Sequence, residues 1–171
     1  MHARLATIDD AEAIRTIYNV EVESSTATFD LVGQAAGHQV AWQEARSGAH
    51  VVIVVEEAGE VLGFGALSPY KDRPAYRMTV ENSVYVARSA HRRGVGRMVM
   101  GELMDIARIH GFHSVVARIE SGQQPSRALH AAMGFTLVGV EREVGRKFGR
   151  WLDVAIMQWM VQPAVLPPTT A

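Results

Sequence analysis

The chain has 171 residues, of which 48% are hydrophobic, and 17 Lys and Arg nearly balance 18 Asp and Glu. That length predicts one domain with a sizeable core, and the balanced charge excludes the strong basic field of a nucleic-acid binder. The absence of cysteine excludes disulfides, thiolate nucleophiles and Cys-based zinc sites. The longest aliphatic run, 51–55, is too short to span a bilayer, and no apolar stretch of signal-peptide length opens the chain. We expect a soluble, cytoplasmic protein with a single domain over residues 1–162 and a disordered Pro-rich tail over 163–171.

Hydrophobic periodicity and turn signals predict an alternation of strands and helices. In chain order we expect a strand at 4–6, a helix capped by Asp9 or Asp10 and ending near 24, a weak helix at 34–46, strands at 51–57, 61–68 and 79–86, a helix at 95–109, a strand at 114–119, a short helix at 125–133, and strands at 135–143 and 151–161. The strand–helix–strand unit over 79–119 predicts parallel neighbours. The order β-α-α-β-β-β-α-β-α-β-β therefore indicates an α/β fold whose mixed sheet is antiparallel at first and parallel at its centre.

A glycine-rich connection, 92–97, joins the strand at 79–86 to the following helix. Free N–H groups and the positive end of a helix favour a phosphate there, and glycine permits close approach. The P-loop motif is excluded because no Gly-Lys-Ser/Thr follows. A dinucleotide fingerprint is weakened because Val99 replaces its third glycine, although Glu120 could serve as its ribose-binding acid. An ordinary solvated turn is the other open interpretation.

This connection resembles motif A of the GCN5-related N-acetyltransferases (GNAT), because Arg92–Gly96 follows a strand and precedes a long helix. The segment 123–135, which contains Pro125, His130 and Gly134, resembles their motif B. Within that superfamily, four segments are similar to those of phosphinothricin and methionine sulfoximine acetyltransferases: 4–29, 79–86, 119–122 and 147–153. The resemblance covers residues 3–162.

The resemblance implies that acetyl-CoA is the donor and that the central parallel strands splay apart to bind it. The residues implied for its pyrophosphate are Arg92, Arg93, Gly94, Val95, Gly96 and Arg97. The pantetheine arm would pair like an extra strand with the backbone of Val84, Tyr85 and Val86. Two positions depart from the family: His91 stands where Gln or Arg is frequent, and Gln123 stands where Asn is frequent. Gln123 would contact the donor through its longer carboxamide arm.

Acetyl transfer from a thioester to an ammonium needs a base, and the resemblance implies that Glu81 is this base. An ordinary carboxylate is a weak base for an ammonium, so burial or a relaying water is required. The alternative is a solvent-facing glutamate paired with an arginine. A backbone N–H near Val86 would bind the oxyanion. His130, where the subfamily also has His, would help the leaving thiolate, with a packing histidine as the alternative.

Cations beside an aromatic residue precede the Glu81 strand, and this chemistry suits a carboxylate or a phosphinate, sulfone or sulfoximine oxygen. The resemblance implies substrate contacts in the same loop. The candidate substrate-binding residues are Lys71, Arg73, Pro74, Ala75, Tyr76 and Arg77, with Phe29 as a wall of the acceptor pocket or a core residue. Ordinary solvation is the alternative for each cation.

We therefore predict an enzyme that acetylates the amino group of small amino-acid analogues. The alternatives are a GNAT enzyme for another amine, such as a polyamine, an aminoglycoside or a protein N-terminus, a non-catalytic acyl-CoA sensor, and, most distantly, a nucleotide-binding module. No metal is expected, because His110 and His113 lack a third ligand nearby, and neither nucleic acid nor membrane is an expected partner. The subfamily resemblance implies a homodimer, for which an exposed apolar final strand at 151–160 would serve.

Overall fold

The computed structural model describes residues 1–46 and 48–161, so the predicted domain boundary at 162 and the predicted tail lie outside the described residues. One mixed sheet runs in the order β1-β2-β3-β4-β5-β7-β6. Its strands are β1 (His2–Leu5), β2 (Val52–Glu57), β3 (Glu60–Pro69), β4 (Thr79–Val86), β5 (Ser114–Glu120), β6 (Thr136–Lys147) and β7 (Arg150–Met160). The helices are α1 (Ala11–Ser24), α2 (Ala36–Glu44), α3 (Val95–Ile109) and α4 (Gln124–Ala132), with short 3₁₀ turns at Ile8–Asp10, Pro74–Tyr76 and Arg88–Ala90. The predicted fold class and element order are confirmed.

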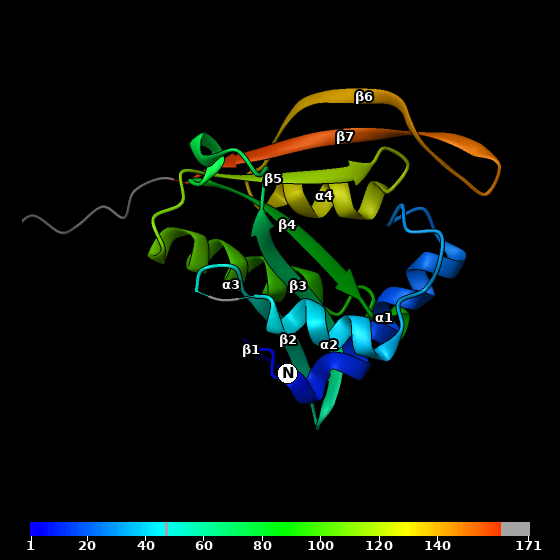
Figure 1. Cartoon of the computed structure of the whole chain (residues 1–171), viewed down its shortest axis with the longest axis vertical. Helices are drawn as coiled ribbons and strands as arrows, with labels where there is room; N and C mark the ends of the chain where they lie inside the picture. Colours follow the sequence, from blue (N-terminus) through cyan, green and yellow to red (C-terminus); the bar gives the residue numbers. More distant parts are fainter. Residues whose placement is uncertain (47, 162–171) are drawn as a thin grey trace, which may run out of the picture.

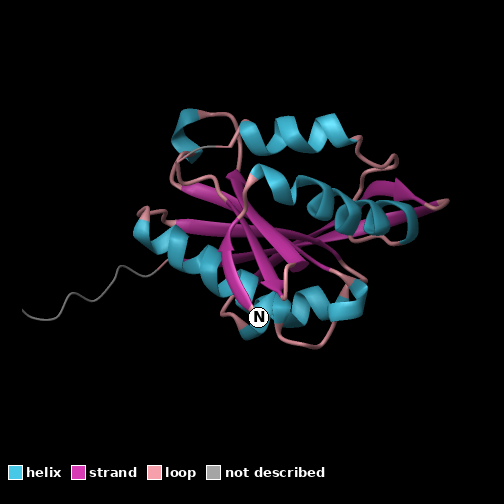
Figure 2. Ribbon diagram, turned by 90° about the horizontal axis from the view of Figure 1, so that it is seen from below, coloured by secondary structure: helices cyan, strands magenta, loops and turns pink. Residues whose placement is uncertain are grey.

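The helices cover both faces of the sheet, as Figure 2 shows. On one face, α3 packs through Val95, Val99 and Leu103, all at most 1% exposed, onto the strands of the larger core. On the other face, α1 contributes Ile14 and Ile17 to a smaller core over β2 and β3. Each helix thus buries one apolar stripe, in line with its amphipathic sequence.

Close packing of α3 onto β3 depends on small residues in the strand. A Cβ added at Gly65 would lie 2.5 Å from Val99 Cγ1 and 2.7 Å from the carbonyl oxygen of Ser83. A side chain at this position would therefore push α3 away from β3 and disturb the neighbouring β4. The position of α3 matters because its first turn forms one side of the candidate site.

The two central parallel strands pair only briefly. β4 pairs with β5 at Thr79, Val80 and Glu81, whereas its pairing with β3 continues without interruption to Val86. Figure 1 shows β4 and β5 diverging from their common start, with α4 beside β5. The sheet is therefore split beyond Glu81, and the second half of β4 has an open edge.

Two local expectations change in the structure. Asp10 stands at the start of α1, but its carboxylate caps no helix N–H; it accepts from the N–H of Thr7 at 2.7 Å and pairs with Arg4 at 2.7 Å. The final strand β7 is not the exposed edge, because it lies between β5 and β6. The exposed apolar edge is instead formed by β6, whose residues Leu137, Val138 and Val140 are 53%, 61% and 46% exposed.

Candidate active site

The open half of β4 presents backbone hydrogen-bonding groups to the gap. The Ala87 N–H bonds to β3, whereas the carbonyl of Met78 accepts from the start of β5. Because successive residues of a strand direct these groups to alternate sides, even-numbered residues face β5 or, beyond Glu81, the gap. The Val86 carbonyl there accepts from Nε2 of His91 at 3.1 Å. Val84 and the N–H of Val86 thus have no strand partner among the described residues, whereas the Tyr85 backbone pairs with Phe64 on β3.

The first turn of α3 lies at the far end of this gap. Met98 N–H is the first to bond within the helix, to the Gly94 carbonyl at 3.0 Å, so three preceding N–H groups lie outside the helical ladder. Gly94 has φ +86°, a left-handed conformation that suits glycine. Arg92 and Arg97 are exposed beside this turn, whereas the guanidinium of Arg93 pairs with Glu57 on β2.

Close packing leaves little room for a side chain at Gly96 in this turn. An added Cβ would lie 3.0 Å from Leu129 Cδ2 on α4 and 3.6 Å from Val86 Cγ2. The backbone amides that follow Gly94 therefore border β4 and α4 directly. Together with the open β4 edge, this arrangement can hold an anionic group at the helix N-terminus and an amide-bearing chain along the strand.

Glu81 stands where β4 leaves β5, in register with Ser68 on β3 and Val116 on β5. Its side chain is half-buried, and this burial raises the pKa of the carboxyl group, while the charge of Arg118 opposes the rise. Arg118 itself pairs with Glu141 at 2.7 Å. No bulge interrupts β3–β4 pairing, so Glu81, Ser83 and Tyr85 share one face of the sheet.

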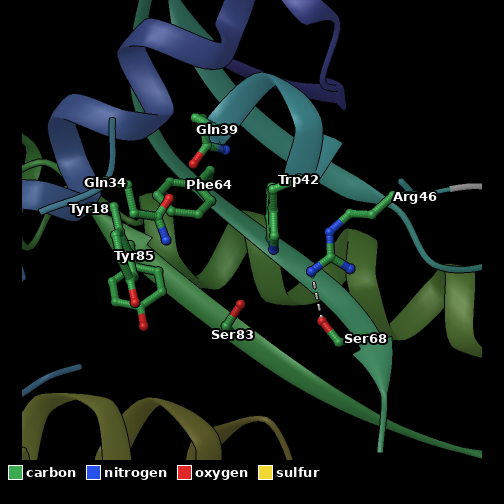
Figure 3. Close-up of a pocket in the computed structure, with 9 residues that line it drawn as sticks. All are labelled: Tyr18, Gln34, Gln39, Trp42, Arg46, Phe64, Ser68, Ser83 and Tyr85. Atoms are coloured by element: carbon green, nitrogen blue, oxygen red, sulfur yellow. Dashed lines mark hydrogen bonds between the residues drawn. The ribbon is translucent and has the colours of Figure 1, made fainter. Parts of the chain in front are cut away.

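On that same face, a cavity of about 180 Å³ opens between the sheet and α1 and α2 (Figure 3). Its lining residues are Tyr18, Gln34, Gln39, Trp42, Arg46, Phe64, Ser68, Ser83 and Tyr85. The Tyr85 ring stacks on Phe64 at 5.2 Å between centroids and meets Tyr18 edge-on at 5.0 Å. A second cavity, of about 220 Å³, lies beside β1 and reaches no residue of β4. The first cavity is therefore the one adjacent to Glu81.

His130 belongs to α4, contacts Asn82 on the opposite face of β4 and is 3% exposed. Its Nδ1 is 2.8 Å from the Ser126 carbonyl and must donate, so in the neutral ring Nε2 accepts from Asn82 Nδ2 at 3.1 Å. Burial lowers the pKa of the imidazole. The help to the leaving group predicted for His130 stays a prediction, and donation through Nε2 would first require that nitrogen to be protonated.

The other residues predicted to bind the acceptor, together with Gln123, are not part of the cavity lining. Gln123 donates to Thr26 Oγ1 at 3.0 Å, and Phe29 rests on Gly145 of β6. The six loop candidates, Lys71, Arg73, Pro74, Ala75, Tyr76 and Arg77, are exposed and line neither cavity. Lys71 Nζ lies 4.8 Å and 5.3 Å from the ring centroids of Tyr70 and Tyr76. Their contact with a substrate stays a prediction.

Most of the cavity lining was missed by the sequence analysis. Tyr18 and Phe64 carry the apolar periodicity of a core, which does not distinguish a cavity wall from a packed interior. Arg46 follows the C-terminus of α2, where a cation is ordinarily a surface residue. Strand alternation from Glu81 was the one available signal, because it places Ser83 and Tyr85 on the same face.

The Acetyltransferase (GNAT) family model matches residues 13–135 of the chain. The chain is a GNAT acetyltransferase. L-amino acid N-acyltransferase MnaT of Escherichia coli is 39% identical over 168 residues, which is 98% of each chain. The L-methionine sulfoximine/L-methionine sulfone acetyltransferase of Pseudomonas aeruginosa is 36% identical over 167 residues, covering 96% of this chain and 97% of that protein.

One of the solved structures that resemble this chain contains the acetyl donor. Phosphinothricin acetyltransferase of Sinorhizobium meliloti, in complex with acetyl-CoA, superposes with a TM-score of 0.90 at 32% identity, covering 98% of this GNAT chain and 92% of that chain. The predicted family, the predicted class of enzyme and the predicted acetyl-CoA donor are confirmed. The β4 edge and the first turn of α3 fit this donor, because they offer strand-pairing groups and an anion site at the two ends of one gap.

Over 1–46 and 48–161, no three His, Asp or Glu side chains gather in a way that could hold a metal ion. Within the same ranges, no helix of this acetyltransferase has the length and apolar character needed to cross a membrane.

Proposed function

We propose that the protein acetylates the amino group of small amino-acid analogues of the methionine sulfoximine, methionine sulfone or phosphinothricin type, by direct transfer from acetyl-CoA with Glu81 as general base. One observation carries this proposal. The half-buried Glu81 carboxylate stands where the β4–β5 gap begins, on the face that carries the aromatic cavity. A donor lying along β4 and an acceptor in the cavity would meet at this residue.

The reaction needs only the two substrates and the groups around the gap. Glu81, directly or through water, takes one proton from the ammonium, and the amine nitrogen then forms a bond to the thioester carbonyl carbon. The Val86 N–H faces the gap, and it would stabilise the negative charge on the carbonyl oxygen. The carbon–sulfur bond breaks, the thiolate takes up a proton, and the products are an N-acetyl amine, the free thiol of CoA and one proton.

The relatives support this class of acceptor. The P. aeruginosa and S. meliloti proteins act on amino-acid analogues whose side chains bear oxygen on sulfur or phosphorus, according to their names. The cavity combines aromatic rings with the side-chain amides of Gln34 and Gln39. Rings suit the aliphatic part of such a side chain, and amides suit its oxo group.

We expect saturable acetyl-CoA turnover with L-methionine sulfone, L-methionine sulfoximine or phosphinothricin. The measurement is the initial rate of CoA thiol release, with mass spectrometry of the N-acetyl product, against a panel that includes spermidine, an aminoglycoside and a peptide with a free N-terminus. Thiol release without an amine is subtracted, because hydrolysis mimics it. Turnover confined to one of the other amines would assign a different GNAT acceptor, and tight acetyl-CoA binding without any transfer would indicate a sensor.

We also propose that two copies associate through the edge strand β6. Three of its side chains, Leu137, Val138 and Val144, are apolar and 51–61% exposed, and β6 ends the sheet. An exposed apolar edge favours association with another chain.

We expect light scattering to give the mass of two 18.7-kDa chains for the protein. Val138→Glu introduces a charge into the exposed edge and should shift the mass to one chain, because a charged residue on an edge strand opposes pairing. Glu102→Gln on the exposed side of α3 is the matched control and should leave the mass unchanged. A monomeric wild type would show that the chain does not dimerise. A Val138→Glu variant that keeps the doubled mass would show that the dimer forms through another surface.

A further inference from the structure

The cavity contains a positive charge that has no acidic partner in the described part of the chain. Arg46 follows α2, and its guanidinium lies 3.9 Å from the centroid of the Trp42 ring. Nη1 donates to the Leu67 carbonyl at 3.1 Å and Nη2 to Ser68 Oγ at 3.0 Å, while Nε is buried with no hydrogen-bond partner. None of the ion pairs within residues 1–46 and 48–161 includes Arg46. Burial lowers the pKa of this guanidinium, which indicates that water compensates its charge only in part.

A buried amide in the same cavity also has an unused hydrogen-bonding group. Gln39 is 2% exposed, and its Nε2 has no partner; Gln34 Oε1 is likewise unpaired among the described side chains. Figure 3 shows both amides on the side of the cavity formed by α1 and α2, with Arg46 and Ser68 at its other end. Buried polar groups are ordinarily paired, so unpaired donors and acceptors around one cavity point to a polar ligand.

The guanidinium is hydrogen-bonded to the residue that stands opposite the proposed base. Ser68, which accepts from Arg46 Nη2, is the residue directly opposite Glu81 in the β3–β4 ladder. Opposite side chains of an antiparallel pair have Cβ atoms only about 4.5–5.5 Å apart. A positive group and a carboxylate thus flank the same short stretch of the sheet, although the two side chains form no ion pair with each other.

We propose that Arg46 binds the α-carboxylate of the acceptor, so that the enzyme selects α-amino acids over simple amines. This inference rests on the proposed function. An α-amino acid carries its carboxylate and its ammonium on one carbon, which matches a guanidinium bonded to β3 and a base on the neighbouring strand β4. Guanidinium recognises carboxylate through forked donors, and Arg46 has donors to spare. The acceptor side chain then extends along the stacked rings of Phe64 and Tyr85 toward the amides of Gln34 and Gln39.

A purely structural role for Arg46 makes a different prediction. Its two hydrogen bonds tie the end of α2 to β3. If that were its whole role, a substitution would affect all acceptors alike. A carboxylate contact instead affects only acceptors that carry the carboxylate, so acceptor chemistry separates the two roles.

The experiment compares L-methionine sulfone with its α-carboxamide in the wild type, Arg46→Gln and Arg46→Lys. The exposed Arg108→Gln, on the far helix α3, is the matched control. For each protein we measure kcat/KM and, independently of turnover, calorimetric binding of both acceptors to the complex with CoA. The ratio between the two acceptors cancels differences in amine basicity when it is compared across variants.

In the wild type and in Arg108→Gln, the carboxylate acceptor should bind and react better, and Arg46→Gln should erase about 10- to 100-fold of that preference. Arg46→Lys should retain part of it, and the KM for acetyl-CoA should stay the same throughout. An Arg46→Gln variant that weakens both acceptors equally, or keeps the preference, would overturn the inference while leaving the proposed function intact. A wild type that neither binds nor acetylates an amino-acid analogue would overturn both.

Discussion

Replacing Glu81 with Gln is expected to lower kcat about 10²- to 10⁴-fold at neutral pH, which is the usual contribution of a positioned general base. Gln keeps the size and polarity of the side chain but cannot take the proton of the ammonium. The affinity for acetyl-CoA should not change, because Glu81 lies on the acceptor face, and the donor groups of β4 begin beyond it. Pre-steady-state transfer and equilibrium binding of CoA measure the two quantities separately.

The pH dependence of this loss has a defined direction. Burial raises the pKa of Glu81, so the acidic limb of kcat/KM for the wild type should lie above the ordinary range of a glutamate. The deficit of the Glu81→Gln variant should shrink at high pH, where more of the amine arrives neutral. A deficit that grows with rising pH would contradict the assignment of Glu81 as the base.

The thermal stability of the Glu81→Gln variant shows whether a loss of activity comes from a folding defect. A carboxyl group whose pKa is raised in the folded state destabilises that state once pH exceeds the unfolded pKa, and the whole penalty is present above the folded pKa. Gln carries no such penalty, so the Glu81→Gln variant should melt at the same temperature as the wild type or higher at neutral pH. Glu102→Gln, an exposed substitution on α3, should change neither stability nor rate. Near wild-type turnover by Glu81→Gln would assign proton removal to another group or to solvent.

Replacing Gly96 with Val is expected to weaken acetyl-CoA binding at least tenfold, since loss of one charge-assisted hydrogen bond has about that effect. Even a Cβ at Gly96 would lie 3.0 Å from Leu129 Cδ2, so we expect a branched side chain to push the Leu129 side chain, and with it α4, away from the first turn of α3. This displacement disturbs the packing that holds the free amides of this turn beside the open edge of β4. Titration calorimetry with CoA measures the affinity, and circular dichroism checks the fold.

Gly101 provides the matched control for this substitution. It lies in the middle of the same helix, and a Cβ added there meets nothing within 4 Å. Gly101→Ala should therefore keep wild-type affinity and gain about 1 kcal/mol of helix propensity. A folded Gly96→Val variant with unchanged affinity for CoA would show that the pyrophosphate does not bind at the first turn of α3.

The helices and strands were predictable from the sequence where packing in the folded protein produces a regular local pattern of apolar residues. The periodicity of α3 and the strand at 79–86 predicted their elements closely, because burial of one helix stripe and pairing along one strand produce those patterns directly. The insertion of β7 between β5 and β6 was not predictable, since nothing local in a strand specifies its neighbours. For the same reason, the exposed apolar edge was assigned to the wrong strand.

The residues of the candidate site likewise fall into those that the sequence indicated and those that it did not. Glu81 and the glycine-rich turn belong to contiguous motifs, so the sequence indicated them through a family resemblance. The cavity is assembled from α1, α2, β3 and β4, and residues such as Gln39 and Arg46 become informative only through their surroundings. A buried amide without a partner and a guanidinium without a carboxylate are properties of the folded chain, and no spacing rule in the sequence reveals them.

The most direct test of the proposed chemistry is a crystal structure of the complex with CoA and L-methionine sulfone. We expect CoA to lie along the open edge of β4, with its pyrophosphate at the first turn of α3 beside Gly94. The amine nitrogen of the acceptor should be hydrogen-bonded to Glu81, directly or through one water, with the acceptor in the cavity beside Ser83. An acceptor whose amine nitrogen lies away from Glu81, with no bridging water, would contradict the proposed arrangement.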